Sequence, residues 1–568
     1  MSQAPESDAL GERLLGMVPN TKKRRPSWWA SVRSLLTLEA DTPARLGAIA
    51  VVAALCGTGV LFILNSEAKD IEQEGYNLVH AILFVFLLVT YRVSQLTLIR
   101  RASDAVETAL DKKRKRAVGL VLSLSLRDLD QLENQAIRSG LSANYGALSQ
   151  ALVPMISGFE AVILLVFMFG YLVYLSPLAA AITAGVLTLT IIGYANHHKK
   201  MTDALRFGSQ SESSFQRQTD GIVGGAKELQ LSRRKREHLK EAMNDSSEGL
   251  ANARKSAARF FADLIATGTS ISYLLAGMVV FILPILSGDN TESLSQTVIA
   301  IIFILSPIGS IVQSMQHFST AQYSLRAINE FESALGELSA GVARDDQEPE
   351  SGIPVFESIK LDSVSYQHDG EHGFAIKSIN LELRRGETLF LTGGNGSGKT
   401  TLLRVITGLY PRAAGNIRLN EDDIERMPKQ PYRELFASVF SDFYLFDGLY
   451  GLSEDDAAQL EHWLKVFKIR DKLAEDLSDL HGEHLSTGQR KRLALALALT
   501  EGRPILVLDE WAADQDPETR RWFYETLLPQ LRSEGLTCLI ITHDESYFEH
   551  CDRRIHMVEG RLRNGASA

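Results

Sequence analysis

The stretch that decides the fold runs from His484 to Pro517 and reads HLSTGQRKRLALALALTEGRPILVLDEWAADQDP. Its first part has the pattern of a helix start, because Ser486 is a favourable N-cap ahead of the apolar and basic run Arg490–Leu499. Its second part, Ile505–Leu508, is typical of a short buried strand and is followed by the acids Asp509-Glu510. This pattern predicts an α/β domain with a polar site at the end of a strand.

A glycine-rich loop upstream supplies another part of such a site. Thr388–Leu391 reads as a buried strand and leads into GGNGSGKT, residues 393–400, which a helical pattern follows. A strand, loop and helix in this order are typical of a phosphate-binding loop, in which backbone N–H groups and a helix N-terminus face the phosphates. We expect Lys399 to reach the β- and γ-phosphates of ATP and the Thr400 hydroxyl to ligate Mg²⁺.

Acidic residues and a histidine follow two of the predicted strands. Asp509 lies at a strand end that should face the phosphate loop, so it is placed to hold Mg²⁺ through water. Glu510 is the best candidate to orient or deprotonate the attacking water. A further apolar strand, Cys538–Thr542, ends at His543, which we expect to contact the γ-phosphate.

The Ser486-Thr487-Gly488-Gln489 segment is a second helix start that favours anions, in a chain that already has one phosphate loop. A single copy of the chain gives this helix start no phosphate to bind. Two copies facing head to tail would resolve the problem, because each would supply its helix start to the ATP bound by the other. The sequence therefore predicts a homodimer.

Six long apolar runs precede this domain in the 568-residue chain. A membrane helix needs about 20 mostly apolar residues. A buried soluble helix could explain any one run but not six in succession, so we expect a six-span membrane domain in contact with the lipid bilayer. The predicted spans are 44–64, 78–99, 152–175, 177–195, 260–286 and 297–318.

Positive charge indicates the orientation of these spans. The segments 100–149 and 196–259 carry nine and thirteen Lys or Arg, whereas 65–77 and 287–296 carry one between them. The positive-inside rule then puts both basic segments and both termini in the cytoplasm. The formal net charge of −10 argues against nucleic acid as a partner, and the basic runs are expected to lie beside anionic lipid head groups.

Each basic segment is long enough to need a turn between a descending and a returning helix. The predicted turns are Leu126–Gln131 and Gly221–Lys227, whose tips would be available to touch a motor domain. Near the N-terminus, the apolar face of Ser27–Leu38 carries tryptophan and favours a helix on the membrane surface, with an ordinary packed helix as the alternative.

The polar segment 339–354 contains Gly and Pro and reads as a linker. The predicted domains are a cytoplasmic N-terminal segment over 1–43, a transmembrane domain over 44–338, this linker, and a nucleotide-binding domain over 355–568.

Together these features resemble the ABC transporter superfamily over nearly the whole chain. The LSTGQ sequence at Leu485–Gln489 matches the signature sequence of the family, with Thr where Gly is usual. The resemblance implies that Tyr366 stacks on adenine and that Asp516 ends the family's D-loop. The family normally has Gln on the loop that leads to its helical subdomain; this chain has Ser441 and then Asp442, and either could substitute near Mg²⁺.

The six spans resemble ABC exporter half-transporters. Several phrases are similar to the cyclic-peptide exporter branch, which includes siderophore-peptide, lipopeptide and lasso-microcin exporters: LDEWAADQDPETRRWFYETLLPQL, LSTGQRKRLALALAL, VFSDFYLFD, ITHDESYFEHCDRR and GAKELQLSRRKRE. The resemblance implies export of a cyclic or modified peptide across the bacterial cytoplasmic (inner) membrane. Lipid, drugs or a siderophore moved inward are alternative cargoes, and an ATP-gated channel is a third interpretation.

The predicted fold is thus an α-helical six-span transmembrane domain fused to an α/β P-loop ATPase domain, with ATP and Mg²⁺ as cofactors. Glu510 and His543 are the predicted catalytic residues, and Thr400, Asp509 and Ser441 form the predicted Mg²⁺ site. The predicted nucleotide-binding residues are Tyr366, Gly393, Asn395, Gly396, Ser397, Gly398, Lys399, Thr400, Thr401, Ser486, Gly488, Gln489 and Asp516.

Overall fold

The chain divides into two compact units. One comprises residues 1–122 and 132–336 and contains the long helices, and the other comprises 123–131 and 337–568 and contains both β-sheets. The predicted surface helix Ser27–Leu38 and most of the predicted linker lie outside the described residues. This computed structural model describes residues 42–70, 77–132, 137–282, 285, 292–339, 352–368, 375–453, 456–474, 477, 480 and 484–564.

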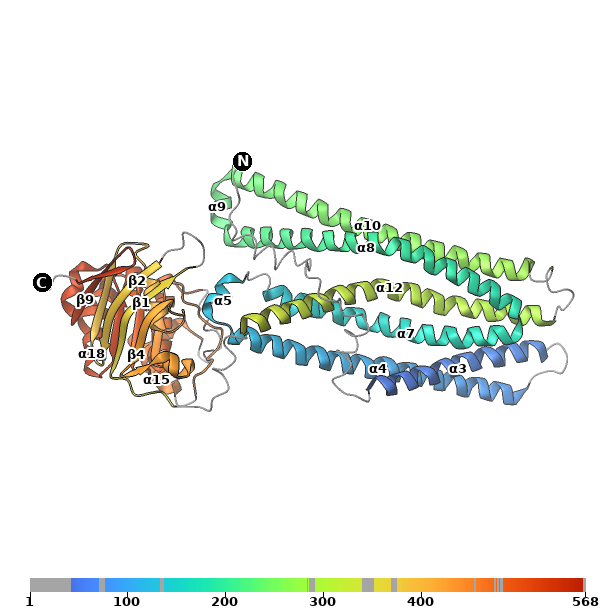
Figure 1. The fold of residues 1–568 in the computed structure, drawn as a ribbon, viewed down its shortest axis with the longest axis horizontal. Coiled ribbons are helices and arrows are strands. Elements are labelled where there is room, and N and C mark those ends of the chain that lie inside the picture. The colour runs from blue at the N-terminus through green and yellow to red at the C-terminus, as the bar shows by residue number, and fades with distance from the viewer. Residues whose placement is uncertain are drawn as a thin grey trace. The chain divides into compact units, whose positions relative to one another are not determined.

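Long helices make up the first unit (Figure 1). Each contains one of the predicted apolar runs, and most continue into polar sequence that also has high helix propensity. The bounds are α3 Thr42–Asp70, α4 Leu78–Ser123, α7 Asn144–Leu175 with the π-turn η1 Ser139–Ala143 ahead of it, α8 Pro177–Gly224, α10 Arg233–Phe281 and α12 Glu292–Ser339.

Five of these helices are long and apolar enough to cross a membrane, judged by length and composition over the described residues. They are α3, α4, α7, α10 and α12. The prediction of six spans is therefore not reproduced in full. The remaining predicted span, 177–195, falls in α8. Its part with described side chains, Pro177–Thr188, is apolar, and the sixth span stays a prediction.

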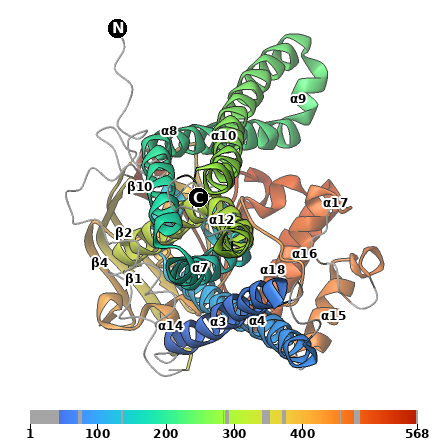
Figure 2. The ribbon, with the colours of Figure 1, turned by 90° about the vertical axis from the view of Figure 1, so that its right-hand side faces the viewer.

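Both predicted turns are present. The chain leaves α8 at Gly224, forms the short helix α9 (Ala226–Leu231) and returns through α10 alongside α8, as both ribbon views show (Figures 1 and 2). The Ser232 hydroxyl caps α10 by accepting a hydrogen bond from the Lys235 N–H. The other turn contains α5 (Leu126–Gln131), which belongs to the second compact unit.

Close backbone approach and buried hydrogen bonds join the membrane helices. Gly158 of α7 lies so near Ser314 of α12 that a Cβ at this glycine would collide with the serine side chain. The buried Asn65 amide of α3 donates to the Tyr171 hydroxyl at 3.1 Å and to the Gln296 carbonyl at 3.0 Å. Contacts of these two kinds stabilise helix bundles in lipid, where the hydrophobic effect does not favour one helix over the lipid tails.

Two sheets form the framework of the second unit. The larger has the order β10-β9-β3-β8-β7-β6 and is parallel except for β10, and the smaller is antiparallel with the order β2-β1-β4-β5. The strands are β1 Ser358–Gln367, β2 Ala375–Arg384, β3 Thr388–Gly393, β4 Ala414–Leu419, β5 Asp422–Asp423, β6 Phe436–Val439, β7 Ile505–Asp509, β8 Thr537–Ile541, β9 Arg553–Val558 and β10 Arg561–Asn564.

The central strands of the larger sheet are buried on both faces. In β3, Phe390 packs into one apolar core, whereas Leu389 and Leu391 pack into the other. Helices and the smaller sheet cover these faces, which explains the uninterrupted apolar runs in the sequence. The main helices of this unit are α13 Lys399–Ile406, α14 Lys429–Arg433, α15 Asp456–Val466, α16 Thr487–Thr500, α17 Pro517–Trp522 and α18 Leu528–Ser533.

Candidate functional site

The phosphate loop follows β3 directly and leads into α13. Gly393 has φ of +149°, and a Cβ there would collide with the Met557 carbonyl. Gly398 has φ of +102° at the start of α13. Both positions therefore require the conformational freedom of glycine. The predicted loop residues Asn395, Gly396 and Ser397 lie between them, and Thr401 lies in the first turn of α13.

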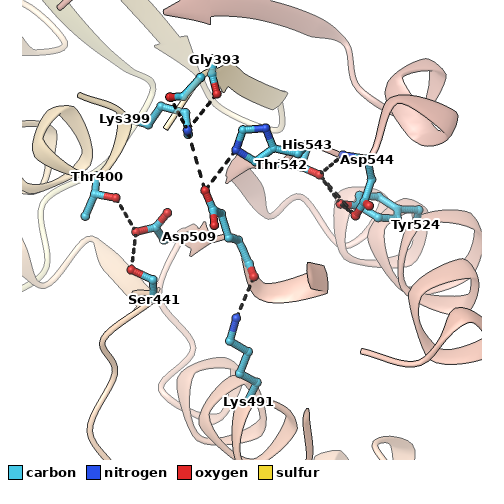
Figure 3. Close-up of polar contacts among 12 residues, drawn as sticks. Gly393, Lys399, Thr400, Ser441, Lys491, Asp509, Tyr524, Thr542, His543 and Asp544 are labelled. Atoms are coloured by element: carbon cyan, nitrogen blue, oxygen red, sulfur yellow. Dashed lines mark hydrogen bonds and ion pairs between the residues drawn. The ribbon is translucent and has the colours of Figure 1, made fainter. Parts of the chain in front are cut away.

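Lys399 is the buried cation of this loop, with only 5% of its surface exposed. Its ammonium group donates to the carbonyls of Gly393 at 2.9 Å and Gly394 at 3.1 Å and lies 3.8 Å from Glu510 Oε1 (Figure 3). The positive charge is thus fixed beside the loop that suits a phosphate chain.

Asp509, at the end of β7, is the buried carboxylate of the site. Its Oδ2 accepts hydrogen bonds from Thr400 Oγ1 at 2.8 Å and from Ser441 Oγ at 3.2 Å (Figure 3). Burial raises the pKa of Asp509 above its usual value, and the two hydrogen bonds oppose the rise.

This group of oxygens has the chemistry of a Mg²⁺ site. Mg²⁺ typically takes one or two protein carboxylates and keeps water or substrate phosphates as its other ligands. The described part of the chain holds no cluster of three or more His, Cys, Asp or Glu side chains placed for a metal. A carboxylate with two hydroxyls beside a phosphate loop fits an ion whose other ligands are nucleotide phosphates and water.

Ser441 and Asp442, the two candidates for the missing glutamine, have different partners. The Ser441 hydroxyl contacts Asp509, whereas the Asp442 carboxylate is 64% exposed and pairs with Arg404 at 2.7 Å. This geometry favours Ser441 as the residue near Mg²⁺.

Glu510 and His543 meet beyond the ends of β7 and β8. His543 Nε2 lies 3.2 Å from Glu510 Oε1 (Figure 3). Glu510 itself has a left-handed backbone, with φ of +51° and ψ of +37°. Such a conformation in a residue other than glycine costs about 1–3 kcal/mol and persists only where the surroundings hold it.

A reciprocal pair of hydrogen bonds holds the backbone at Glu510. The buried Lys491 ammonium of α16 donates to the Glu510 carbonyl at 2.8 Å and pairs with Asp514 at 2.7 Å. The fully buried Trp511 indole donates to the Lys491 carbonyl at 2.8 Å. These contacts hold α16, the helix that the LSTGQ sequence begins, against the segment that carries Glu510, the predicted catalytic base.

The predicted N-cap at Ser486 is confirmed. Its hydroxyl accepts a hydrogen bond from the Gln489 N–H at 3.3 Å, and the Gln489 side chain accepts one from the Ser486 N–H at 3.0 Å. A Cβ at Gly488 would come within 2.8 Å of the Asp514 carbonyl, and the Gln515 amide donates to the Gly488 carbonyl at 3.1 Å. The start of α16 thus packs against residues 514–515 of its own chain.

Asp516 caps α17. Its carboxylate accepts hydrogen bonds from the Thr519 N–H at 2.9 Å and the Thr519 hydroxyl at 2.7 Å, and the first of these lowers the pKa of Asp516. The nucleotide-related role expected for this residue stays a prediction.

The expectation that Tyr366 stacks on adenine needs correction. The ring is only 2% exposed. It stacks on Tyr410 with ring centroids 5.1 Å apart and meets His368 edge-on at 5.0 Å. Because protein side chains cover it, the ring offers no free face to a base in this structure.

A second polar network was not predicted from the sequence. Arg520 donates to the carbonyls of Ala512 at 3.2 Å and Ala513 at 3.1 Å, and it pairs with Asp544 at 3.3 Å. The Tyr524 hydroxyl lies 2.7 Å from the Thr542 hydroxyl and donates to Asp544 at 3.0 Å (Figure 3). The network joins the segment after Glu510 to the residue after His543, so it supports both predicted catalytic residues.

A phosphate loop, an acid pair and a histidine at one sheet edge, in a chain with helices able to cross a membrane, define a membrane-bound ATPase. The chain belongs to the ABC transporter family. Residues 376–513 match the family described as ABC transporter. The ATP-binding protein SyrD of Pseudomonas syringae pv. syringae is 34% identical over 411 residues, which cover 70% of this chain and 72% of SyrD.

Two further similarities bear on architecture. An ATP-dependent lipid A-core flippase of Alkalilimnicola ehrlichii is 34% identical over 246 residues, covering 40% of this chain and 41% of the flippase. The structure of a bacterial Atm1-family ABC exporter with ATP bound superimposes on this chain with a TM-score of 0.71 and 17% sequence identity. The superposition covers 92% of this chain and 94% of the exporter chain. The chain thus has the ABC exporter fold, and it is an ATPase coupled to transport.

Replacing Lys491 with Met tests the role of the buried ammonium group. The Glu510 carbonyl would lose the hydrogen bond from the Lys491 ammonium group and keep the weaker one from the Ala513 N–H at 3.3 Å. Loss of a hydrogen bond to a charged group costs about 1.5–3 kcal/mol, so thermal unfolding should shift to lower temperature. Because Glu510 would no longer be held, kcat for ATP hydrolysis should fall about 10- to 100-fold. Lys465→Met is the matched control, since Lys465 is exposed and pairs with Glu461 one turn away on its own helix. Equal activities of the two variants would contradict the assignment.

Proposed function

We propose that the chain works as a homodimeric, ATP-driven exporter of a cyclic or modified peptide across the bacterial inner membrane. The proposal of a dimer rests on one observation. The helix start at Ser486–Gln489 favours anions, but the domain has one phosphate loop elsewhere. Ser486 and Thr487 at this helix start are exposed, so the proposal assigns it to the ATP bound by a second copy.

ATP binding would clamp the nucleotide-binding domains of two copies together, since each ATP would touch both chains. Binding energy that favours one of two states can then drive the membrane helices between inward and outward openings. Hydrolysis with Glu510 as base would release the clamp. Mg²⁺, held by Thr400, Asp509 and Ser441, would offset phosphate charge, while Lys399 and His543 position the phosphate that is cleaved.

The proposed orientation rests on charge. Both termini and the basic segments around Lys112–Arg116 and Arg233–Arg236 would lie in the cytoplasm, as the positive-inside rule requires. The helices that carry these segments are continuous with the apolar stretches of α4 and α10.

The cargo is supported only by resemblance in sequence. The phrases shared with cyclic-peptide exporters favour a peptide, and the 411 residues aligned with SyrD exceed the 214 residues of 355–568, so that similarity extends into the membrane half. The flippase relative favours lipid as the second candidate, with drugs or an imported siderophore as further alternatives.

Glu510→Gln tests the catalytic base. The amide keeps the size and hydrogen-bonding reach of the carboxylate but cannot accept a proton, so kcat should fall by about 10² or more. ATP binding, measured by equilibrium titration, should be retained. An ATPase rate near that of the wild type would show that another group acts as base.

Shared sites can be tested by mixing two inactive chains. Lys399→Ala removes the phosphate-loop charge, and Ser486→Arg blocks the signature helix start, so each homodimer should be inactive. In a heterodimer of the two, one ATP site has both defects and the other has neither. Purified through two different tags, this heterodimer should regain about half of the wild-type ATPase rate.

The matched control places both substitutions on one chain and pairs it with wild type. Each site of that heterodimer then has one defect, so little activity is expected. If the sites are not shared between chains, the pattern is reversed: the first heterodimer is inactive, and the control, which contains one intact chain, keeps about half of the wild-type rate.

The cargo can be tested in inside-out vesicles that contain the full-length protein. A cyclic lipopeptide or a lasso peptide should be taken up in an ATP-dependent manner and stimulate ATPase several-fold, and Glu510→Gln should abolish uptake. Uptake of lipid A but of no peptide would favour the flippase alternative. Ion conductance without uptake would favour the gated channel.

A further inference from the structure

The short helix α5 is joined to the ATPase domain by a hydrogen bond as well as by apolar packing. It lies in the chain between α4 and α7 but belongs to the compact unit that contains both sheets. Leu126 packs against the apolar core beneath α13. Asp130, at the other end of α5, accepts a hydrogen bond from the Tyr410 hydroxyl at 2.6 Å.

Tyr410 is buried and held in place by its neighbours, and it connects α5 to Arg404. Its surface is only 4% exposed, its ring stacks on Tyr366, and the Arg404 guanidinium lies 5.5 Å from the ring centroid. Arg404 also donates to the Tyr410 hydroxyl at 2.9 Å. The hydroxyl therefore joins Asp130 on one side to Arg404 on the other.

Arg404 also contacts the loop that contains Ser441 and Asp442, beside the ATP site. A second guanidinium nitrogen donates to the Asp442 carboxylate at 2.7 Å. Thr400 precedes Arg404 by four residues on α13, so the two side chains share one helix face. Thr400 and Ser441 both contact Asp509, while Arg404 contacts Asp442. The loop is thus held at two successive residues, at Ser441 by Asp509 of β7 and at Asp442 by Arg404 of α13.

We propose that Asp130, Tyr410, Arg404 and Asp442 form a relay that sets the position of Ser441 at Asp509 according to the position of α5. The four are positioning residues, and only Ser441 would touch the metal site. When α5 shifts with the membrane helices, the loop shifts with it, and the hydroxyl moves relative to the carboxylate that holds Mg²⁺.

The energetics fit a positioning role better than a structural one. Asp442 is largely exposed, and an ion pair at such a position contributes little to stability. A misplacement of about 1 Å at a reacting centre can, by contrast, lower a rate about 10²-fold. The relay acts on ATP hydrolysis alone, so its test does not depend on the cargo or on the direction of transport.

The test is a double-mutant cycle in the full-length protein, reconstituted in vesicles of phosphatidylethanolamine and phosphatidylglycerol. Tyr410→Phe removes the shared hydroxyl, and Asp130→Ala removes its acceptor on α5. Each should lower kcat for ATP hydrolysis about tenfold and leave KM for MgATP within about twofold. Because both break the same relay, the double variant should be no slower than either single one.

Two controls separate positioning from general destabilisation. Tyr432→Phe removes a buried hydroxyl that donates to the Ile406 carbonyl at 2.6 Å, outside the relay. Asp128→Ala makes the same charge change on α5, at a carboxylate that bonds Ser125 of its own turn. Both controls should keep kcat within about twofold of wild type, even where the unfolding temperature falls.

The proposal is overturned if Asp130→Ala leaves kcat unchanged or if the two relay substitutions reduce kcat additively. It is also overturned if Tyr432→Phe lowers kcat as much as Tyr410→Phe does. Asp130 is exposed, so Asp130→Ala is expected to fold and keeps the test decisive if Tyr410→Phe proves unstable.

Discussion

Alignment of parallel strand ends is the constraint on which the ATP site depends. Leu391 of β3 pairs with Ile541 of β8, and Ile541 pairs with Asp509 of β7. The phosphate loop, Glu510 and His543 each follow one of these strands, so this register brings three distant segments to one sheet edge. Both faces of the sheet are buried, and a slip of one residue would exchange the apolar contacts of a strand between two different cores. The apolar sequence of the strands thus determines the geometry of the polar site.

Features governed by neighbouring residues could be predicted from the sequence. The phosphate loop requires glycine at particular backbone angles, and the cap of α16 is formed by Ser486 and Gln489 alone. The turn between α8 and α10 follows from Gly224 and Gly225, where α8 ends, and from Ser232, which caps α10. In each of these places, the local sequence contains all the groups that make the structure, and the strand ends then extend the prediction to the catalytic pair.

Features that depend on distant contacts were missed or misjudged. Lys491 reads as one of several basic residues on a helix, and only the fold brings it to the Glu510 carbonyl, 19 positions away. Tyr366 was expected to be accessible, but β1 has an irregular register between Leu361 and Val364. After that irregularity Val364 and Tyr366 both point into the core, and simple alternation from the start of the strand does not reveal this.

A serine at the position where the family resemblance leads us to expect glutamine, beside the proposed Mg²⁺ site, changes what the loop must do. Serine is shorter by two side-chain atoms, so a hydroxyl that lies 3.2 Å from Asp509 requires the loop backbone itself to come close. A long side chain can adjust its torsions when a loop shifts, whereas a serine hydroxyl moves almost rigidly with the backbone. The site therefore becomes sensitive to loop position, and an anchor on the adjacent residue becomes useful. Asp442, which is paired with Arg404, provides such an anchor, and this gives Ser441 and Asp442 separate tasks.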